Sequence, residues 1–243
     1  MGNNTYRLVG ILISKLSMQI NNDFAQRIHI QYGDLQWTAS PNPMVQRKML
    51  ERDGFEVARA TSIVQYEAGA KFSQHTHELG EEIFVLNGAF SDESGHYEEG
   101  TYIKSPPGSS HSPCSEQGCS LFVKLRHMRS HDGQRVVINT NTTSWHPGLI
   151  NGLQVMPLSE FESEHTALVR WAPGTYFSAH RHFGGEEILV LEGLFEDEHG
   201  SYPAGSWLRS PHLSTHKPFS TTGCTIWVKT GHLSAHEPVI AWQ

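Results

Sequence analysis

The sequence repeats itself at a fixed interval of 105 residues. Residues 69–131 align with residues 174–236 without a gap, and 30 of these 63 aligned positions are identical. Further upstream the interval becomes 108, since Gln26 and Arg27 match Gln134 and Arg135; repeat 2 is therefore three residues shorter between the two regions. A long repeat of this kind predicts one structural unit that occurs twice in the chain.

The repeat also sets the expected domain boundaries. We expect an N-terminal arm over 1–25, a first domain over 26–132 and a second domain over 133–243. The join at Asp132 and Gly133 is too short for a free linker, so the two domains should pack together. The 243 residues are enough for two domains that each bury a core.

Each repeat has the pattern of an all-β domain. Apolar residues run almost without a break from Ile83 to Leu86, which is typical of a buried core strand. Residues 100–105 and 121–125 predict further strands, 87–88 predicts a turn, and 92–95 and its counterpart 197–200 predict hairpin tips. Helical periodicity is weak throughout. Many short strands with 22 glycines and 12 prolines favour a double-sheet jelly roll or barrel.

Candidate metal ligands recur at matching positions in the two repeats. His75 and His77 are two residues apart, so on a strand they point to the same face. Glu81 follows a short turn, and His111 lies 30 residues beyond it. Repeat 2 has the same four residue types, and the full candidate set is His75, His77, Glu81, His111, His180, His182, Glu186 and His216. Three imidazoles and one carboxylate suit a divalent first-row metal, which predicts two metals per chain.

The same spacing resembles a known family. Repeat 1 reads Gly69-x5-His75-x-His77-x3-Glu81-x6-Gly88 and Gly100-x5-Pro106-x-Gly108-x2-His111, which is similar to the two cupin motifs. Repeat 2 departs from the second motif at Leu213, where the family has glycine. The resemblance implies two tandem cupin barrels, that is, double-stranded β-helix or jelly-roll domains. Within the cupins, the His-Thr-His, Glu-Glu and Ser-Pro-Pro-Gly-x-x-His stretches are most similar to the cupin domain of ChrR, a zinc-binding anti-sigma factor.

The resemblance to ChrR-type proteins implies zinc, but it covers the cupin part alone. Those proteins also have an N-terminal helical domain that holds zinc through a His-x3-Cys-x2-Cys motif and binds the sigma factor. No cysteine precedes Cys114 in this sequence, so we do not expect the chain to bind a sigma factor through such a domain.

Other matched residues have two interpretations each. Glu82 and Glu187 follow the ligand glutamates and are either partners of ligand histidines or solvated strand residues. Cys119 and Cys224 are expected to be small buried hydrophobes rather than redox sensors. The matched histidines near the end of each repeat are expected at strand ends or interfaces, with a second metal site as the alternative; they are His127, His131, His232 and His236. The matched aromatic residues are expected in the barrel lining or core; they are Phe72, Phe90, Phe177, Phe195, Tyr66 and Trp171.

Composition excludes several classes of function. The net charge is −7 and no basic run is present, so we expect no nucleic-acid partner. The apolar stretch 8–20 contains Lys15 and is too short to cross a bilayer, which predicts no membrane partner and no signal peptide. The three cysteines form no disulfide framework, which favours a reducing cytoplasm. A homodimer is expected by analogy with other cupins.

Three functions remain open at this point, and the third of them is a storage-like or purely structural role for the two cupin domains. The first is a zinc-dependent regulatory or sensor protein of the ChrR cupin type, with a closed metal shell. The second is a small-molecule metalloenzyme, dioxygenase-like and acting on a diketone-like or phenolic compound, with iron, nickel or manganese and open coordination positions. In the first two cases each barrel is expected to hold a small-molecule ligand, and the sequence identifies no catalytic residue beyond the metal ligands.

Overall fold

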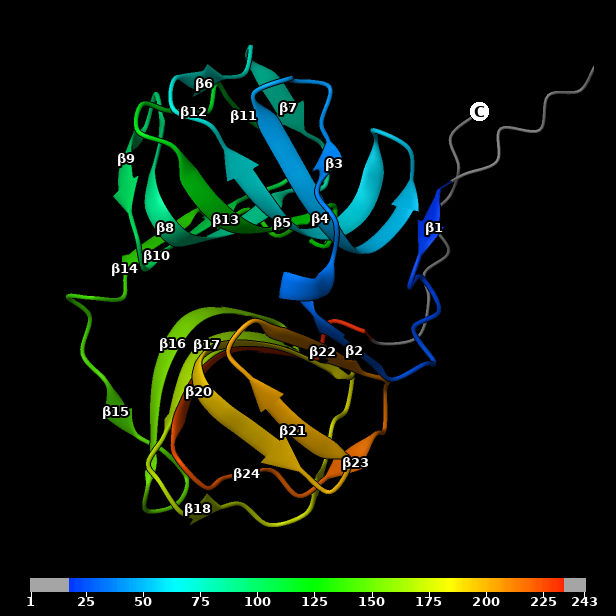
Figure 1. The fold of residues 1–243 in the computed structure, drawn as a ribbon, viewed down its shortest axis with the longest axis vertical. Helices are drawn as coiled ribbons and strands as arrows, with labels where there is room; N and C mark the ends of the chain where they lie inside the picture. Colours follow the sequence, from blue (N-terminus) through cyan, green and yellow to red (C-terminus); the bar gives the residue numbers. More distant parts are fainter. Residues whose placement is uncertain (1–17, 234–243) are drawn as a thin grey trace, which may run out of the picture.

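The computed structural model describes residues 18–233, and it consists of two stacked lobes of β-strands (Figure 1). Each lobe is a jelly roll of antiparallel strands, and the only helical turn in the described part is the 3₁₀ turn η1 (Tyr32–Asp34). The predicted all-β class with two tandem units is confirmed. The expected arm lies outside the described residues over positions 1–17, and β1 (Gln19–Ile20) begins soon after them.

Lobe 1 comprises an eleven-stranded sheet together with the small sheet of β7 and β11. Its other strands are β1, β3 (Thr38–Ala39), β4 (Val45–Gly54), β5 (Ala58–Tyr66), β6 (Ala70–Lys71), β8 (Glu81–Asp92), β9 (Gly95–Glu98), β10 (Thr101–Ser105), β12 (Cys114–Ser115), β13 (Cys119–Leu125) and β14 (Val136–Asn139). The two strands of the small sheet are β7 (His75–His77) and β11 (Ser109–His111).

Lobe 2 repeats this arrangement with a ten-stranded sheet and the small sheet of β19 and β23. Its strands are β2 (Ile28–Gln31), β15 (His146–Pro147), β16 (Leu153–Phe161), β17 (Glu164–Trp171), β18 (Thr175–Tyr176), β19 (His180–Arg181), β20 (Glu186–Asp197), β21 (Gly200–Pro203), β22 (Ser206–Ser210), β23 (Thr215–His216), β24 (Phe219–Ser220) and β25 (Cys224–Thr230). The three residues missing from repeat 2 come from the β4–β5 hairpin, which spans 45–66 where β16–β17 spans 153–171.

The first strand of each repeat belongs to the sheet of the other repeat. Strand β2, from repeat 1, pairs with β22 of lobe 2, and β14, from repeat 2, pairs with β10 of lobe 1. Figure 1 shows β2 beside β22 in the lower lobe and β14 beside β10 in the upper lobe. The two lobes are therefore linked by reciprocal strand exchange as well as by packing.

The predicted turn at Asn87 and Gly88 is wrong. Both residues lie inside the long strand β8, where the pairing with β13 shifts register by one residue and Gly88 has a φ of 74°. The same shift occurs in β20, where Gly193 has a φ of 72°. These are β-bulges that bend a strand without ending it. The predicted hairpin tips are confirmed, since Asp92 pairs with Gly95 and Asp197 with Gly200.

Residues 18–233 form three apolar cores, one inside each lobe and one between them. Phe90 and Phe195 are each 1% exposed and lie in the cores of lobes 1 and 2, as predicted. The core between the lobes combines residues of both repeats, including Phe122 and Trp227, whose ring centroids are 5.0 Å apart. Each buried side chain of this size contributes roughly 1.5–3 kcal/mol to folding, so the inter-lobe core makes the expected packing of the two units strong.

A quartet of buried charges crosses the same interface. Glu82 lies directly opposite Lys124 in lobe 1, and Glu187 lies directly opposite Lys229 in lobe 2. The ion pairs nevertheless form between lobes, with 2.6 Å from Lys124 Nζ to Glu187 Oε2 and 2.7 Å from Lys229 Nζ to Glu82 Oε1. Both earlier interpretations of the two glutamates are therefore wrong, because they are neither solvated nor bonded to ligand histidines.

Two of the matched histidines also lie in this buried region. His232 Nε2 is 3.0 Å from Glu187 Oε2, and His127 Nε2 is 3.3 Å from Thr61 Oγ1. These contacts agree with an interface role and not with a second metal site. His131 is exposed and bonds Glu162, while His236 lies outside the described residues.

Candidate metal centres

Three of the predicted ligands in lobe 1 come from one small two-stranded sheet. Strand β7 carries His75 and His77, and β11 ends at His111, which pairs directly with His75. The alternation of side chains along β7 leaves both of its histidines on one face. The three ring centroids are 4.8 to 5.1 Å apart, and His77 Nε2 lies 3.0 Å from His111 Nε2.

Glu81 completes the first cluster from the start of β8. The chain turns back after β7 through Gly80, which has a φ of 72° and donates its N–H to the His77 carbonyl. That left-handed conformation favours glycine. The turn places Glu81 Oε2 3.5 Å from His77 Nε2 and 3.5 Å from His111 Nε2. The predicted turn thus brings the carboxylate to the imidazoles.

Lobe 2 assembles its four predicted ligands in the same way. His180 pairs with His216 across β19 and β23, and His182 follows directly after β19. Glu186 Oε2, at the start of β20, lies 3.5 Å from His182 Nε2 and 3.6 Å from His216 Nε2. Ligand atoms of all four residues lie within 4.8 Å of one another, and those of the three histidines in lobe 1 do the same.

Contacts behind the ligands fix the direction of the imidazole lone pairs. His75 Nδ1 donates to the Ser73 carbonyl at 2.9 Å, and His180 Nδ1 donates to the Ser178 carbonyl at 3.1 Å. His111 Nδ1 and His216 Nδ1 each lie 3.3 Å from an aspartate oxygen, of Asp92 and Asp197 respectively. A donor at Nδ1 leaves the Nε2 lone pair free for a ligand, which is the arrangement found behind metal-bound histidines.

These two aspartates were missed from the sequence as functional residues. They were interpreted as hairpin-tip residues, and they do accept backbone N–H groups there, from Gly95 and His199. Their identity at matched positions of the two repeats was the signal that could have found them.

Burial is the largest cause of the shifted pKa values among the candidate ligands. Burial, with the neighbouring imidazoles, lowers the pKa of His77 and of His182 to about 3. Burial raises the pKa of Glu81 to about 8 and that of Glu186 to about 7. His77 and His182 are therefore neutral near pH 7, as metal ligands must be. Burial dominates at both carboxyls, and at Glu186 it outweighs His216 and Arg27, which act to lower the pKa.

The donor set fits a divalent metal ion. Three ligand atoms are buried with no hydrogen-bond partner, namely Glu81 Oε2, His182 Nε2 and His216 Nε2. A buried polar atom without a partner is costly, so buried ligand atoms that lie close together and lack hydrogen-bond partners fit a site for a bound cation. Separations of 3.0 to 3.6 Å between donors suit atoms that each lie about 2.0–2.2 Å from one ion.

The lobe 1 site opens into a cavity of about 830 Å³. Its lining is mainly apolar, and it includes His75, His77, His111 and Glu81. Tyr66 also lines it, is 8% exposed, and its hydroxyl has no hydrogen-bond partner among the described residues. The apolar lining is formed by Val45, Val64, Phe72, Ile83, Phe90, Leu121, Val123 and Leu125.

The charged part of this cavity's lining differs from the corresponding part of lobe 2. Arg47 bonds Glu56 at 3.1 Å and Arg126 bonds Glu78 at 2.8 Å, and all four residues line the cavity. Glu56 lies in the β4–β5 hairpin that is shorter in repeat 2. At the positions of Arg47, Glu78 and Arg126, repeat 2 has Val155, Phe183 and Gly231. The two sites share their ligands but not their surroundings.

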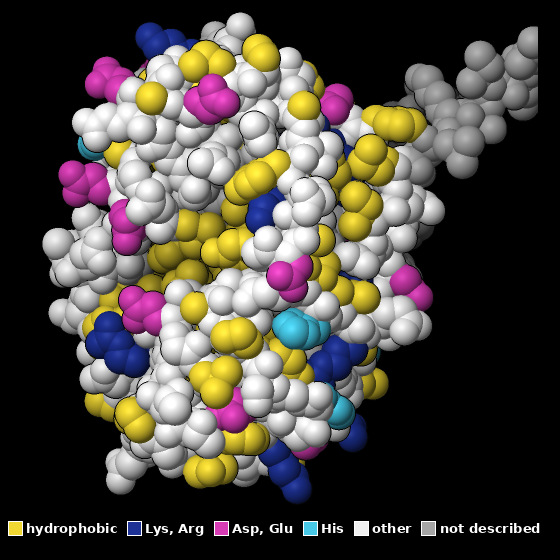
Figure 2. All heavy atoms as spheres, in the orientation of Figure 1, with side chains coloured by type: hydrophobic (Ala, Val, Ile, Leu, Met, Phe, Trp, Pro, Cys, Tyr) yellow, Lys and Arg dark blue, Asp and Glu magenta, His cyan; other side chains and the backbone are white. Residues whose placement is uncertain are grey.

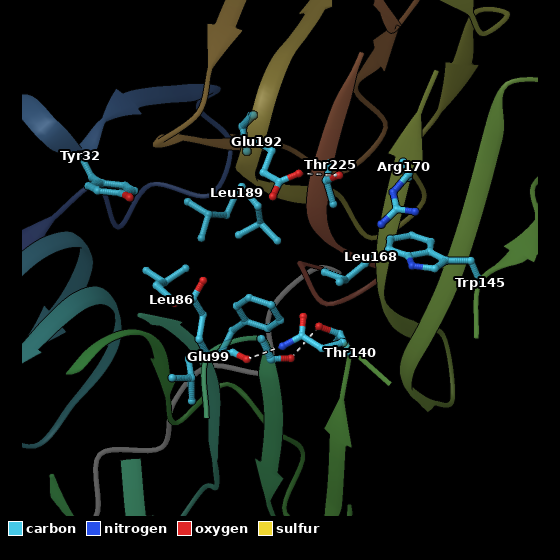
Figure 3. Close-up of a pocket in the computed structure, with 16 residues that line it drawn as sticks. Tyr32, Leu86, Glu99, Thr140, Trp145, Leu168, Arg170, Leu189, Glu192 and Thr225 are labelled. Carbon is cyan, nitrogen blue, oxygen red and sulfur yellow. Dashed lines mark hydrogen bonds between the residues drawn. The ribbon is translucent and has the colours of Figure 1, made fainter. Parts of the chain in front are cut away.

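A second, smaller cavity of about 250 Å³ lies between the lobes and away from both ligand clusters. Figure 2 shows hydrophobic side chains in a hollow between the two lobes. Figure 3 shows the residues around the cavity, with Arg170 beside Trp145; the guanidinium carbon is 4.1 Å from the ring centroid. Leu86 and Glu99 come from repeat 1, whereas Arg170 comes from repeat 2.

The three cysteines are free thiols, and two of them are buried as predicted. Burial raises the pKa of Cys119 and of Cys224 to about 11, which disfavours a reactive thiolate. No helix in residues 18–233 has the length and apolar character needed to cross a bilayer.

Solved structures with the same fold support the architecture. A putative dioxygenase from Nostoc punctiforme has a TM-score of 0.71 at 14% identity, covering 90% of this chain and 87% of that one. A putative glyoxylate-induced protein from Pseudomonas aeruginosa has a TM-score of 0.69 at 13% identity, covering 93% and 95%. Oxalate decarboxylase from Lactobacillus farciminis has a TM-score of 0.58 at 12% identity, covering 84% and 86%. At these identities the likeness shows the fold alone.

Sequence comparison gives the family. No curated protein matches the chain. The model of the ChrR Cupin-like domain matches twice, over residues 25–129 and 133–234, so it covers both repeats and most of the chain. The chain therefore belongs to the ChrR cupin-like family and contains two copies of its domain.

Proposed function

We propose that this protein is a metal-dependent small-molecule enzyme whose active site is the lobe 1 cluster. The observation that supports this most directly is the cavity of about 830 Å³ that leads to His75, His77, His111 and Glu81. A concave, mostly apolar cavity with a few convergent polar groups is the usual form of a small-molecule site. We propose one divalent metal in each lobe, with lobe 2 holding its metal as a structural counterpart.

The lining of the cavity suggests the class of substrate. Apolar walls favour a compact, largely hydrophobic molecule, and a metal held by the lining residues favours one that presents oxygen donors. A diketone-like or phenolic compound has both properties. The Tyr66 hydroxyl can donate a hydrogen bond to a second oxygen of such a molecule, and burial raises the pKa of Tyr66 well above 10, so it stays protonated. A bound iron, manganese or nickel ion with open positions would supply activation of O2 or polarisation of the substrate.

The experiment reconstitutes metal-free protein with iron, manganese, nickel or zinc and supplies a 1,3-diketone or a catechol. Consumption of O2 and loss of substrate are measured for each combination. We expect turnover with at least one redox-active metal, loss of turnover in His77→Ala, and retained turnover in His182→Ala. A Leu121→Trp variant fills the cavity without removing a ligand, so it should keep two metals and lose turnover. Full activity in Leu121→Trp, or no reaction with any metal and substrate, contradicts the proposal.

A zinc-dependent regulatory or sensor role is the second candidate. The family match supports it, since the matched domain is named for ChrR. The compact four-residue group in lobe 2 also supports it, because four protein ligands close a tetrahedral zinc shell. Under this candidate a sigma factor is the partner to test, and the three free thiols suit a reducing cytoplasm. Native protein that carries zinc in both lobes, each with four protein ligands, favours this role over catalysis.

A further inference from the structure

The strand exchange places an arginine from each repeat behind the metal site of the other. Arg27 precedes β2, the strand that repeat 1 contributes to lobe 2. Arg135 precedes β14, the strand that repeat 2 contributes to lobe 1. The two arginines occupy matched positions in the repeats, and neither belongs to the predicted ligand sets.

In lobe 2 the contacts run from Arg27 to a ligand histidine in two steps. Arg27 Nη2 lies 2.5 Å from Asp197 Oδ2 and 3.0 Å from the Tyr202 hydroxyl. Tyr202 donates its hydroxyl to Asp197 Oδ1 at 2.9 Å. Asp197 Oδ2 in turn lies 3.3 Å from Nδ1 of the ligand His216, and the Asp197 side chain is fully buried. Both side-chain oxygens of Asp197 therefore have hydrogen-bond partners.

In lobe 1 the contacts from the arginine to the ligand histidine take three steps. Arg135 Nη2 lies 2.8 Å from the Tyr97 hydroxyl, and Tyr97 donates to Asp92 Oδ1 at 3.1 Å. Asp92 Oδ2 lies 3.3 Å from Nδ1 of the ligand His111. Here the arginine contacts the tyrosine, and the structure has no contact between Arg135 and Asp92. The path from the arginine to the ligand histidine thus contains one more hydrogen bond in lobe 1 than in lobe 2.

We propose that Arg27 and Arg135 are positioning residues, each of which completes the metal site built by the other repeat. A carboxylate behind a ligand imidazole holds the ring in orientation and raises the basicity of its other nitrogen. A buried aspartate needs hydrogen bonds and a cation to stay ionised and in place. Arg27 supplies both to Asp197 directly, and Arg135 acts on Asp92 through Tyr97.

The inference rests on the metal binding proposed above, but not on any catalytic activity. It states that metal affinity in one lobe depends on a side chain of the other repeat. Loss of such an outer partner commonly lowers metal affinity by 10-fold to 100-fold. Because Arg27 acts through Asp197, we expect a loss of about 10-fold at the lobe 2 site in Arg27→Ala, at the lower end of that range. Arg135→Ala should weaken the lobe 1 site by a smaller factor.

The experiment measures Co²⁺ affinity in the full chain with a competing chelator, one site at a time. A His77→Ala background weakens the lobe 1 site, and a His182→Ala background weakens the lobe 2 site. Arg27→Ala is expected to lower Co²⁺ affinity and to alter the cobalt absorption bands in the first background, and to leave both unchanged in the second. Arg135→Ala should show the reverse. Arg27→Lys keeps the charge and should recover part of the lost affinity.

The variant Ile28→Ala distinguishes the effect of loosening strand β2 from the effect of losing the Arg27 side chain. Ile28 packs against the inter-lobe core next to Arg27, so this variant loosens β2 and leaves the arginine contacts intact. It should lower the melting temperature without changing the cobalt bands. If Arg27→Ala weakens both lobes equally, or leaves lobe 2 unchanged, the inference is wrong. If the parent protein binds no Co²⁺ at all, the proposed metal binding fails instead.

Discussion

The Lys124 ammonium of repeat 1 lies 2.6 Å from Oε2 and 2.8 Å from Oε1 of the Glu187 carboxylate of repeat 2, and both side chains are fully buried. Glu187 also accepts from Trp207 and lies 3.0 Å from His232. The pair is therefore shielded from water and fully hydrogen-bonded. Glu186, the residue before Glu187, is a proposed metal ligand, so the interface and the site share one strand end.

Removing one member of this pair should be strongly destabilising. Lys124→Met leaves a buried carboxylate without its cation, which typically costs about 3–5 kcal/mol. The exposed pair between Arg126 and Glu78 is the matched control, because Glu78→Gln there should cost less than about 1 kcal/mol. Urea unfolding measures both variants. Equal losses of unfolding free energy would show that the buried pair does not hold the lobes together.

Each ligand cluster should lose its metal independently. His77→Ala removes one Nε2 ligand from lobe 1, and His182→Ala removes one from lobe 2. We expect metal content to fall from two to one per chain in either variant, because no ligand residue is shared between the clusters. Elemental analysis of the purified variants gives the ratio. A fall to zero in a single variant would show that one site depends on the other being filled.

Stability should fall in mild acid because of buried neutral histidines. Burial lowers the pKa of His232 to about 4, while the same group in the unfolded chain titrates near 6.5. Between these pH values the unfolded state binds the proton and the native state does not. Unfolding free energy therefore decreases as pH falls from about 6.5 to about 4, by up to about 3 kcal/mol for this group.

The measurement compares metal-free parent protein with His232→Gln, whose amide can still donate to Glu187 but does not titrate. Urea unfolding at pH 7, 6 and 5 gives the slope of stability against pH for each protein. Averaged over this range, the variant should have a slope shallower by about 1 kcal/mol per pH unit. Parallel slopes for the two proteins would show that His232 titrates normally in the fold.

Two glycines with the same backbone conformation should respond differently to substitution. Gly88 and Gly108 have φ values of 74° and 82°. A Cβ at Gly88 would lie 2.3 Å from the Gly118 carbonyl oxygen, whereas a Cβ at Gly108 meets nothing within 4 Å. Gly108→Ala should therefore cost only the backbone strain of about 1–2 kcal/mol, and Gly88→Ala clearly more.

Thermal unfolding of the two alanine variants tests the difference between them. Leu213 gives an internal comparison, because it occupies the position of Gly108 in repeat 2 with a φ of 65°. Leu213→Gly should be tolerated without loss of stability, since it relieves strain at an exposed position. A larger loss in Gly108→Ala than in Gly88→Ala would contradict this account.

The grouping of the candidate ligands was predictable because it depends on local structure. His75 and His77 are fixed by strand alternation, Glu81 by a short turn, and His111 by the strand that pairs with His75. Each of these local features can be recognised from a short segment of the sequence. Recurrence in repeat 2 then distinguished these candidate ligands from the other histidines.

The exchange of strands was not predictable, because nothing in the sequence distinguishes the two sheets that β2 could join. Both sheets present an equivalent edge, at β10 and at β22, so the choice depends on how the lobes face one another. The ionic quartet was missed for the same reason. Glu82 and Glu187 lie on the face of their strands opposite the ligand glutamates. A charged residue on such a face is expected to be solvated unless a second lobe covers it, as happens here.

The reciprocal exchange has a consequence for a chain that has been cut. A protease that cleaves between Asp132 and Gly133 divides the repeats, but each fragment still contributes one strand to the sheet of the other. The two pieces form an interlocked heterodimer with the same ladders of hydrogen bonds as the intact chain. To separate the two fragments, β2 and β14 must both be withdrawn from their sheets. The cleaved protein should therefore migrate as one species of the intact size until it unfolds.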